Sequence, residues 1–399
     1  MQFRRRSAVI VALGINQVLA FASSFYLPAV LAVPMSRELG ISSSSVFAAF
    51  SVALLMSAFV GPHIGRTFDR FGGRPILVAT SVVFALALLL LGSAQNPAWM
   101  FAAWALLGLA MCSGLYEGAF ATLVRLYGQD ARGAITGVTL FGGFASTVGW
   151  PLSAWMEAHF GWRGACYGWA LLQLLVALPL HALLPARAGA APVAPRPASE
   201  QTPPAAQRAP EAGNARGTLL LALVFSVVVF NSTAMAAHLP GLLVIAGASV
   251  GSAVAVAALV GPAQVAGRVL EYGVLGKLHP LLSGRLAALA HPLGAALLAL
   301  AGAPAAAGFV IIHGTGNGIL TVARGTLPLA LFGAAGYGRR QGLLMVPSGI
   351  AQAAAPWLFG LCIERWGLGS LWVSSALAVL AFGALMMLRA PARPADATR

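Results

Sequence analysis

Long apolar runs recur along almost the whole of this chain and limit its fold more than any other feature. About 20 consecutive apolar residues form a helix long enough to cross the hydrocarbon core of a bilayer, and a helix satisfies its own backbone hydrogen bonds there. Charged residues make up only 9% of the chain, against about 25% in a soluble domain, so most of its surface is expected to face lipid. The runs predict twelve membrane-spanning helices, at residues 8–32, 44–64, 75–93, 98–124, 134–155, 163–185, 218–244, 249–275, 286–302, 305–330, 342–362 and 369–389.

The basic residues are distributed unevenly between the two sides of the membrane that these helices define. Lys and Arg are enriched in cytoplasmic loops, and with twelve crossings the side that holds both termini receives nearly all of them. The opposite side receives Arg37, Arg163 and Arg365. We therefore expect a multi-pass protein of a bacterial inner membrane with both termini in the cytoplasm. Since the formal charge of +14 is spread over short loops, it does not indicate a face that binds nucleic acid.

A Pro- and Ala-rich stretch at residues 186–217 divides the expected helices into two sets of six. A segment of this composition cannot bury enough apolar area to fold, which indicates a linker. The predicted organisation is a first six-helix bundle at 1–185, a cytoplasmic linker at 186–217, a second bundle at 218–389 and a cytoplasmic tail at 390–399.

The two sets of helices also repeat short motifs in the same order. The pairs are Tyr26-Leu27-Pro28 with His238-Leu239-Pro240, Gly61-Pro62 with Gly261-Pro262, and Gly65-Arg66 before Asp69 with Gly267-Arg268 before Glu271. Such an order is expected of a duplicated half, with the two bundles related by an axis along the membrane normal.

The loop after the second helix carries the most specific motif in the chain, Gly65-Arg66-Thr67-Phe68-Asp69-Arg70-Phe71-Gly72-Gly73-Arg74. It resembles the signature that the major facilitator superfamily carries between helices 2 and 3, and it lies at the same place. The resemblance implies an all-α membrane protein of two pseudo-symmetric six-helix bundles that acts as a secondary active transporter by alternating access. It also implies gating by Gly65, Asp69, Arg70, Gly72 and Arg74, with Arg268 and Glu271 as the second bundle's version of this cluster.

Within that family, the first half of the chain most resembles the monocarboxylate and oxalate:formate branch. The comparable stretches are Phe25-Tyr26-Leu27-Pro28, residues 35–40, and Asp130-Ala131-Arg132-Gly133. This resemblance implies a small organic anion of the monocarboxylate type as the substrate. Two alternatives stay open. One is efflux of drugs or toxic metalloids such as arsenicals, whose carriers residues 313–325 and 336–340 faintly resemble. The other is a membrane sensor that does not transport.

In the fold that the resemblance implies, spans 1, 4, 7 and 10 line a central cavity, so ionisable residues in spans 4 and 10 are the first candidates for a site. Glu117 in span 4 lies about 12 Å from Arg125 along the helix axis. An ionisable group at this depth usually faces a cavity or a partner, which makes Glu117 a candidate proton carrier. Arg324 in span 10 has a planar guanidinium that matches a carboxylate. We expect it to bind the substrate anion, to neutralise Glu117, or to do each in turn.

Further polar residues in the cavity-lining spans complete the predicted site. Span 10 is rich in glycine around His313, whose side chain can titrate near physiological pH, and His313 is the second candidate for proton coupling. The expected substrate-binding residues are Arg324, Tyr26, Asn16, Asn231, His238 and Asn317. The alternative for each uncharged member is a hydrogen bond that only joins two helices.

Several functional classes find no support in the sequence. No glycine-rich loop followed by Lys-Ser or Lys-Thr indicates nucleotide binding, and no cluster of metal ligands or nucleophile–base pair indicates an enzyme. The three cysteines, Cys112, Cys166 and Cys362, all lie in apolar runs, which argues against a disulfide framework or a zinc site. We expect no cofactor and no metal. The predicted partners are a small-molecule substrate, protons and the lipid bilayer, with no nucleic acid, and the predicted state is a monomer.

Overall fold

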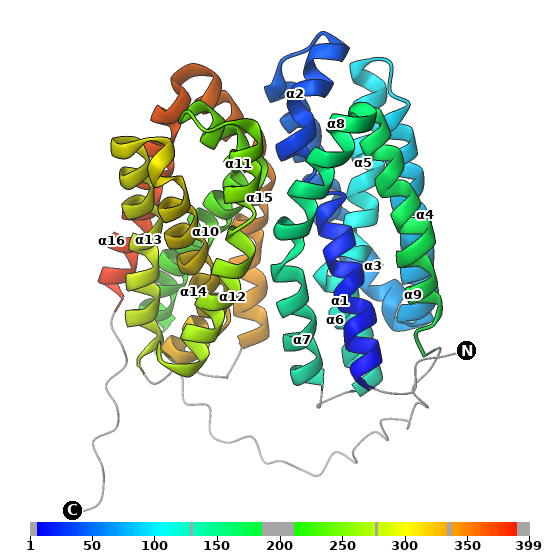
Figure 1. Ribbon diagram of the computed structural model, residues 1–399. Helices are drawn as coiled ribbons and strands as arrows, with labels where there is room; N and C mark the ends of the chain where they lie inside the picture. Colours follow the sequence, from blue (N-terminus) through cyan, green and yellow to red (C-terminus); the bar gives the residue numbers. More distant parts are fainter. Residues whose placement is uncertain (1–5, 128–130, 186–210, 276–277, 333–336, 389–399) are drawn as a thin grey trace, which may run out of the picture.

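The computed structural model describes residues 6–127, 131–185, 211–275, 278–332 and 337–388, and the regular structure in these ranges is helical throughout (Figure 1). The helices form two bundles that stand side by side, and the first and last described residues lie at the same end of the molecule. We call this end the terminal face and the opposite end the far face.

The first bundle contains the helices before residue 186. They are α1 (Arg6–Ala22), α2 (Pro28–Leu39), α3 (Ser43–Phe71), α4 (Gly73–Gly92), α5 (Pro97–Gly114), α6 (Tyr116–Tyr127), α7 (Ala131–Gly143), α8 (Ala145–Leu172) and α9 (Leu178–Ala182), with a π-helical turn at Gln173–Ala177 between the last two.

The second bundle contains the remaining helices. They are α10 (Glu211–Ile245), α11 (Val250–Ala257), α12 (Val260–Gly273), α13 (Pro280–Ala301), α14 (Ala306–Phe332), α15 (Tyr337–Trp366) and α16 (Ser370–Met387), with short 3-10 turns at Ala303–Ala305 and Gly367–Gly369. Helix α10 begins earlier than the expected start at residue 218, inside the stretch predicted as a linker. Residues 186–210 and the tail from residue 389 lie outside the described residues.

The described helices account for twelve membrane crossings. Nine helical segments are long and apolar enough to cross a bilayer, but two of them, Gly133–Ala182 and Leu344–Met387, contain 50 and 44 residues. Because a crossing needs only about 20 residues, each of these two must turn back once. The turns lie at Gly161 and Gly367, whose φ values of 68° and 54° favour glycine. Counting each long segment as two crossings, and adding the crossing made by α1 with α2, gives the twelve that the apolar runs predict.

The first crossing is broken in its middle, whereas the sequence predicts one uninterrupted helix at 8–32. The hydroxyl of Ser23 donates to the carbonyl of Leu19 at 2.7 Å, and that of Ser24 donates to the carbonyl of Ala20 at 2.6 Å. Such back-bonding weakens a helix. Pro28 then begins α2, where its missing N–H costs no helical hydrogen bond. The break places Tyr26 near the middle of the molecule.

The apolar cores show that the bundles meet toward the far face and part toward the terminal face. A core cluster built on residues such as Leu31, Phe50 and Trp104 of the first bundle also includes Ala237 and Ala353 of the second. Nearer the terminal face, each bundle has a cluster of its own: one contains only residues before 186, the other only residues after 210.

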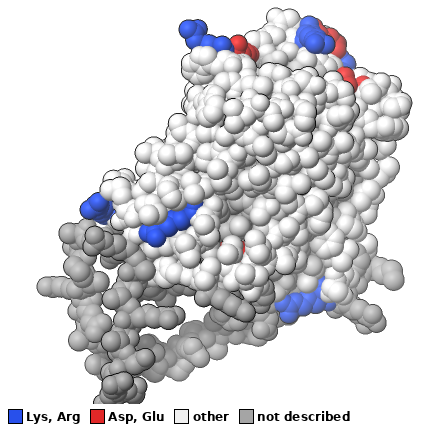
Figure 2. All heavy atoms as spheres, turned by 60° about the vertical axis from the view of Figure 1, so that its left-hand side comes forward, with Lys and Arg blue, Asp and Glu red and all other residues white. Residues whose placement is uncertain are grey.

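Charged side chains gather at the two ends of the molecule and leave a broad uncharged belt between them, on the face shown in Figure 2. This distribution is expected of a protein whose middle is surrounded by hydrocarbon. It agrees with the crossings counted above, and the chain is a multi-pass membrane protein.

Candidate functional site

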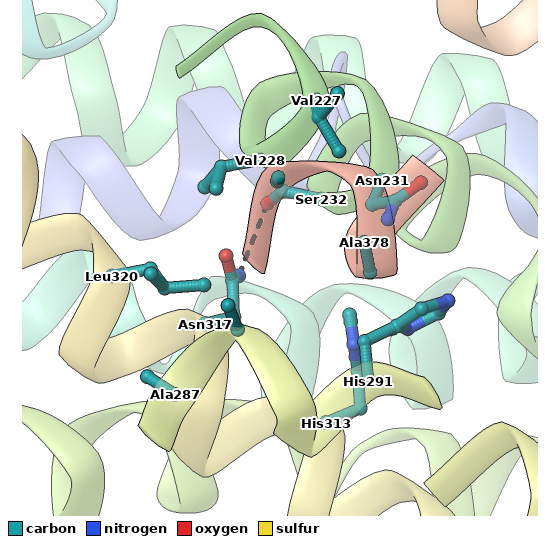
Figure 3. Close-up of a pocket in the computed structure, with 12 residues that line it drawn as sticks. Val227, Val228, Asn231, Ser232, Ala287, His291, His313, Asn317, Leu320 and Ala378 are labelled. Carbon is teal, nitrogen blue, oxygen red and sulfur yellow. Dashed lines mark hydrogen bonds between the residues drawn. The ribbon is translucent and has the colours of Figure 1, made fainter. Parts of the chain in front are cut away.

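Two small cavities with polar side chains in their lining lie next to each other near the centre of the molecule. The first, with about 10 Å³ of room for water, lies between the bundles and is lined by Tyr26 and Trp150 of the first bundle and by Ser232, Gln264, His313 and Asn317 of the second, among others. The other, with about 30 Å³, lies inside the second bundle (Figure 3) and shares Ser232, His313 and Asn317 with the first. Because they share these residues, the two cavities lie next to each other, and we call them together the polar region.

Helix α14 supplies a polar stripe to this region. At 100° per residue, His313, Asn317 and Arg324 fall within about 40° of one another around the helix, so they lie on one face. Asn317 donates to the Ser232 hydroxyl of α10 at 3.0 Å, the bond drawn in Figure 3. Arg324 lies about 16 Å from His313 along the axis, toward the terminal face. Its side chain is partly exposed, and its nearest described polar contact is the Met345 sulfur, 3.6 Å from a guanidinium nitrogen.

Glycine lets α14 approach its neighbours closely enough to form this region. A Cβ added at Gly318 would collide with the backbone carbonyl of Gln264 on α12, and one added at Gly316 would collide with Ala290 on α13. The glycine-rich segment around His313 therefore packs against two helices and stays helical, so its glycines serve close packing rather than unwinding.

Glu117 lies in the first turn of α6, directly after a break in the fourth crossing. Leu115 is extended, with φ −81° and ψ −163°, and separates α5 from α6. A carboxylate is favoured at the start of a helix by the helix dipole. The Glu117 side chain is accessible to solvent yet surrounded by protein, and its charge interacts with that of Arg324. Glu117 therefore faces the other bundle and not the lipid.

The structure brings Glu117 and Arg324 into electrostatic range without joining them. Among the residues described, the one ion pair with an N–O distance of 4.0 Å or less is Arg163 with Glu38, at the far face. Both members of the central pair thus keep hydrogen-bonding capacity for a third group, which is the arrangement that an anion or a proton would use.

Arg268 of α12 crosses from the second bundle to the first. Its guanidinium donates to the backbone carbonyl of Thr139 on α7 at 2.9 Å and lies close to the hydroxyl of Tyr116. Their spacing places Arg268 and Glu271 on one helix face, but no ion pair joins the two among the described residues. Glu271 is buried, and its Oε2 atom has no hydrogen-bond partner there.

The predicted gating loop forms a tight turn between α3 and α4. Gly72 has a φ of 85°, a conformation that glycine adopts at little cost. Arg70 lies over the ring of Phe71, with 5.0 Å from its guanidinium carbon to the ring centroid. Gly65 is exposed and Arg74 is half-buried. The Asp69 side chain lies outside what the structure describes, although its backbone belongs to α3.

Arg125 is a member of this turn that the motif does not reveal. It lies in the last turn of α6 and donates to the backbone carbonyl of Phe68 at 3.2 Å, at the carboxyl end of α3. A cation there satisfies a free carbonyl and opposes the negative end of the helix dipole. Its position at the end of span 4, on the side that holds the motif loop, was the signal available in the sequence.

The remaining predicted residues divide between the polar region and other places. Asn231 lines the cavity of the second bundle and donates to the backbone carbonyl of Ser374 at 3.0 Å. His238 lies against the ring of Phe47, 3.8 Å between centroids, and bonds to the carbonyl of Pro356, so it joins the bundles outside the cavities. Asn16 is buried, and neither polar atom of its side chain has a partner among the described residues.

Sequence reasoning missed Trp150, Ser232, Gln264 and His291, which line the two cavities. These residues lie in spans 5, 7, 8 and 9, and only the span that holds Ser232 belongs to those expected to line the centre. For metals, the described residues contain no group of three or more His, Cys, Asp or Glu side chains that could hold an ion.

The sequence profile of the Major Facilitator Superfamily matches residues 13–337. The chain belongs to this superfamily. Superfamily membership confirms the all-α fold and the family that the loop motif resembles, and it makes the chain a member of a family of transporters, not of enzymes. The nucleoside transporter NupG has a solved structure of the same superfamily fold, with a TM-score of 0.74 over 96% of this chain and 100% of that one, at 16% sequence identity.

Relatives within the superfamily match only part of the chain. An uncharacterized 38 kDa protein of Thermoproteus tenax is 31% identical over 42% of this chain and 43% of its own length. The 4-hydroxybenzoate transporter PcaK of Pseudomonas putida is 29% identical over 39% of this chain and 35% of its own. The multidrug resistance protein MdtG of Salmonella typhi is 34% identical over 29% and 28%. The matched stretches span less than half of each relative, and they do not resolve a branch within the superfamily.

Proposed function

We propose that this superfamily member is a secondary active transporter that carries a small organic anion of the monocarboxylate type, coupled to protons, by alternating access. The observation that carries the proposal is Arg324. It is a partly exposed arginine without an ion-pair partner in the described residues, and it lies on the same stripe of α14 as the cavity residues Asn317 and His313.

An arginine in this position favours an anion with planar oxygens. Its guanidinium presents several N–H donors in a fixed fork, which pairs with a carboxylate through two parallel hydrogen bonds. Tyr26, Asn317 and Gln264 add neutral hydrogen-bonding groups farther along the same region. The substrate of PcaK, 4-hydroxybenzoate, is a carboxylate, which supports the same substrate class here.

Glu117 and His313 are the groups that we propose couple transport to protons. Glu117 faces Arg324 across the bundles without contact, so a carboxylate substrate bound to Arg324 would repel it. Protonation of Glu117 would remove that repulsion. Binding of the anion and of the proton would therefore favour each other, which is the condition for symport.

The bundles are proposed to rock about this centre, with the terminal face in the cytoplasm. The bias of basic residues toward the terminal side supports this orientation. In the described conformation the cores join near the far face and part toward the terminal face, which would open the site inward. The reverse conformation requires breaking contacts such as His238 with Phe47, while Arg268 and the turn from Gly65 to Arg74 hold or release the terminal side.

The test is transport by purified protein in liposomes with an imposed pH gradient, using pooled carboxylates, common drugs and arsenite as separate substrate sets. We expect accumulation of one or more monocarboxylates that depends on the gradient and falls by at least about 100-fold in Arg324→Ala, the loss of about 2.7 kcal/mol of binding. Arg365→Ala is the matched control, since Arg365 is exposed at the far end of α15. Equal carboxylate uptake by Arg324→Ala and wild type would refute the anion site.

A second candidate is efflux of drugs, which the 34% identity to MdtG over 116 residues favours. The same liposomes separate the two functions. Efflux of cationic drugs that survives Arg324→Ala would support the exporter, because a positively charged arginine does not attract a cationic substrate.

A further inference from the structure

A chain of buried hydrogen bonds in the second bundle ends at a cavity, and we propose that its last member, His313, takes up one proton per transport cycle while His291 holds it in position. The inference deepens the proposed function and rests on it, since it names the ion-binding atom of the second bundle and the number of protons that bind there. It leaves Glu117 as the group that responds to the substrate.

Four hydrogen-bonding groups from three helices form the chain. Nδ1 of His313 on α14 lies 3.0 Å from Nδ1 of His291 on α13. Nε2 of His291 lies 2.9 Å from the hydroxyl of Ser374 on α16, and that hydroxyl lies 3.0 Å from the carbonyl of Leu371. Both imidazoles and Ser374 are buried. Figure 3 shows the two histidines side by side at the edge of the larger cavity.

The directions of these bonds follow from the hydrogens available. The Leu371 carbonyl can only accept, so Ser374 donates to it and His291 donates to Ser374 through Nε2. A neutral His291 then has a bare Nδ1, and His313 must donate to it through its own Nδ1. This leaves Nε2 of His313 as an acceptor, and no described group bonds to that atom. If Ser374 instead donated to His291, its bond to the Leu371 carbonyl would be lost, and Nε2 of His313 would already carry a hydrogen; the bond to Leu371 therefore favours the first arrangement.

One proton fits this chain and a second does not. A lone pair of His313 Nε2 forms an N–H bond with a proton from hydronium in the cavity, and the hydronium leaves as water. The Nδ1 contact with His291 survives, because His313 still donates and His291 still accepts. A second proton would make both Nδ1 atoms donors at 3.0 Å and break the contact. The row of hydrogen bonds ends at the backbone carbonyl of Leu371, which only accepts and cannot pass a proton on. The proton must therefore return to the cavity that supplied it.

The surroundings make this proton the main local charge. The residues that line the two cavities include no Asp, Glu, Lys or Arg. Besides His313 and His291, their one titratable side chain is Tyr26, from the turn between α1 and α2. Polar neighbours are Asn231 and Ser232 on α10, Gln264 on α12 and Asn317 on α14. The ring of Phe309 lies 5.8 Å from the His313 ring, centroid to centroid, within the range in which an aromatic face attracts a cation.

A positive charge on His313 would be felt in the cavity between the bundles, because His313 lines that cavity as well. The charge would favour entry of an anion and balance it. The proton on His313 would offset the charge of one monovalent anion.

The first measurement is the titration of wild-type protein labelled with ¹⁵N-histidine in lipid nanodiscs, followed from about pH 8 to about pH 4, on either side of the usual histidine pKa of about 6.5. The chain has seven histidines, so each signal is assigned by substitution. We expect one member of the pair to become protonated at Nε2, a signal that His313→Gln removes. His181→Gln is the matched control, because His181 is buried in the first bundle against Ser81 and should leave the signal in place.

The second measurement compares two transport modes in liposomes. His313→Gln should lose accumulation driven by a pH gradient while it retains exchange of labelled for unlabelled anion, since exchange needs no net proton movement. His291→Gln should keep part of the coupling, because its amide oxygen still accepts from His313.

Two results would overturn the proton site: a pair that binds two protons, or a His313→Gln protein that couples as tightly as wild type. Failure of the wild type to transport any anion would refute the proposed function instead, and the titration would still decide whether His313 binds the proton.

Discussion

The two bundles share repeated motifs, yet they place their central ionisable groups by different means. In the first bundle, the fourth crossing is broken at Leu115, and the break puts Glu117 in the first turn of α6. In the second bundle, the corresponding tenth crossing is the unbroken α14, and Arg324 follows from helical periodicity alone. A break in the backbone therefore positions Glu117 in the first bundle, whereas spacing along an unbroken helix positions Arg324 in the second.

Because of this difference, different substitutions should displace Glu117 and Arg324. Discontinuous helices in transporters usually mark binding sites, because helix ends there offer unpaired backbone groups. The position of Glu117 depends on the packing that creates the break, whereas the position of Arg324 depends on the close approach of α14 to α12 and α13. Substitutions can therefore separate the charge of each group from the geometry that holds it.

The largest effect is expected from reversing the charge in the second bundle. Arg324→Glu would set two carboxylates facing each other and the substrate, and like charges placed together cost several kcal/mol. We expect carboxylate uptake to fall at least about 100-fold, equivalent to about 2.7 kcal/mol. Radiolabelled uptake into liposomes measures the change.

The double variant Glu117→Arg with Arg324→Glu sharpens this comparison. Recovery of more than about tenfold over Arg324→Glu alone, a coupling of about 1.4 kcal/mol, would show that the two charges act together. Arg365→Glu at the far face serves as the control for charge reversal. Undiminished uptake by Arg324→Glu would mean that α14 does not present the anion site.

A smaller effect is expected from disturbing the break in the first bundle. A Cβ added at Gly118 would collide with the Ser113 carbonyl on the other side of the break. Gly118→Ala should lower the stability of the protein by about 1–3 kcal/mol, the range for overpacking, as measured by thermal unfolding in detergent. Gly383→Ala on the exposed side of α16 meets no atom within 4 Å and should leave stability unchanged or raise it slightly. Similar unfolding temperatures for both variants would show that the break does not depend on Gly118.

The crossings and the polar stripe of α14 were predictable because each depends on one helix at a time. Lipid requires about 20 apolar residues per crossing, so twelve runs predict twelve crossings. The positions of His313, Asn317 and Arg324 follow the helical repeat. Both predictions need only spacing along the sequence.

The contacts between helices were not predictable in this way. Pairing of His291 with His313 depends on how α13 meets α14, and the sequence shows only a histidine beside a proline in an apolar run. The contact of Arg268 with Thr139 depends on how α12 and α7 of opposite bundles approach each other, which the sequence does not show. The break at Leu115 has no proline signal, and at the break Gly118 lies close against the Ser113 carbonyl.

The smallest effect on stability is expected at the far face, where hydrogen bonds connect the ends of neighbouring helices within each bundle. In the second bundle, a backbone bond of 3.1 Å from Ala303 to Ala246 does so. In the first bundle, side chains do so: the Arg163 guanidinium donates to the carbonyl oxygens of Gly92 and Ala94, and its Nε donates to a Glu38 oxygen at 2.9 Å. The side-chain contacts at the first bundle's far end should therefore respond to pH.

The pKa of the Glu38 carboxyl is lowered, first by the indole N–H of Trp162 and then by Arg163. A lowered pKa in the folded state means that the stabilisation is complete above the pKa of the unfolded chain, about 4.3, and is lost as the pH falls through the folded value. The Glu38 side chain is 50% exposed, so the contribution is about 1 kcal/mol or less. Glu38→Gln should unfold at a lower temperature than wild type at neutral pH, and the gap should close below about pH 4. Glu157→Gln on α8, which has no ion pair in the described residues, should show no such closing. A gap that stays constant with pH would mean that the charge of Glu38 does not stabilise this end.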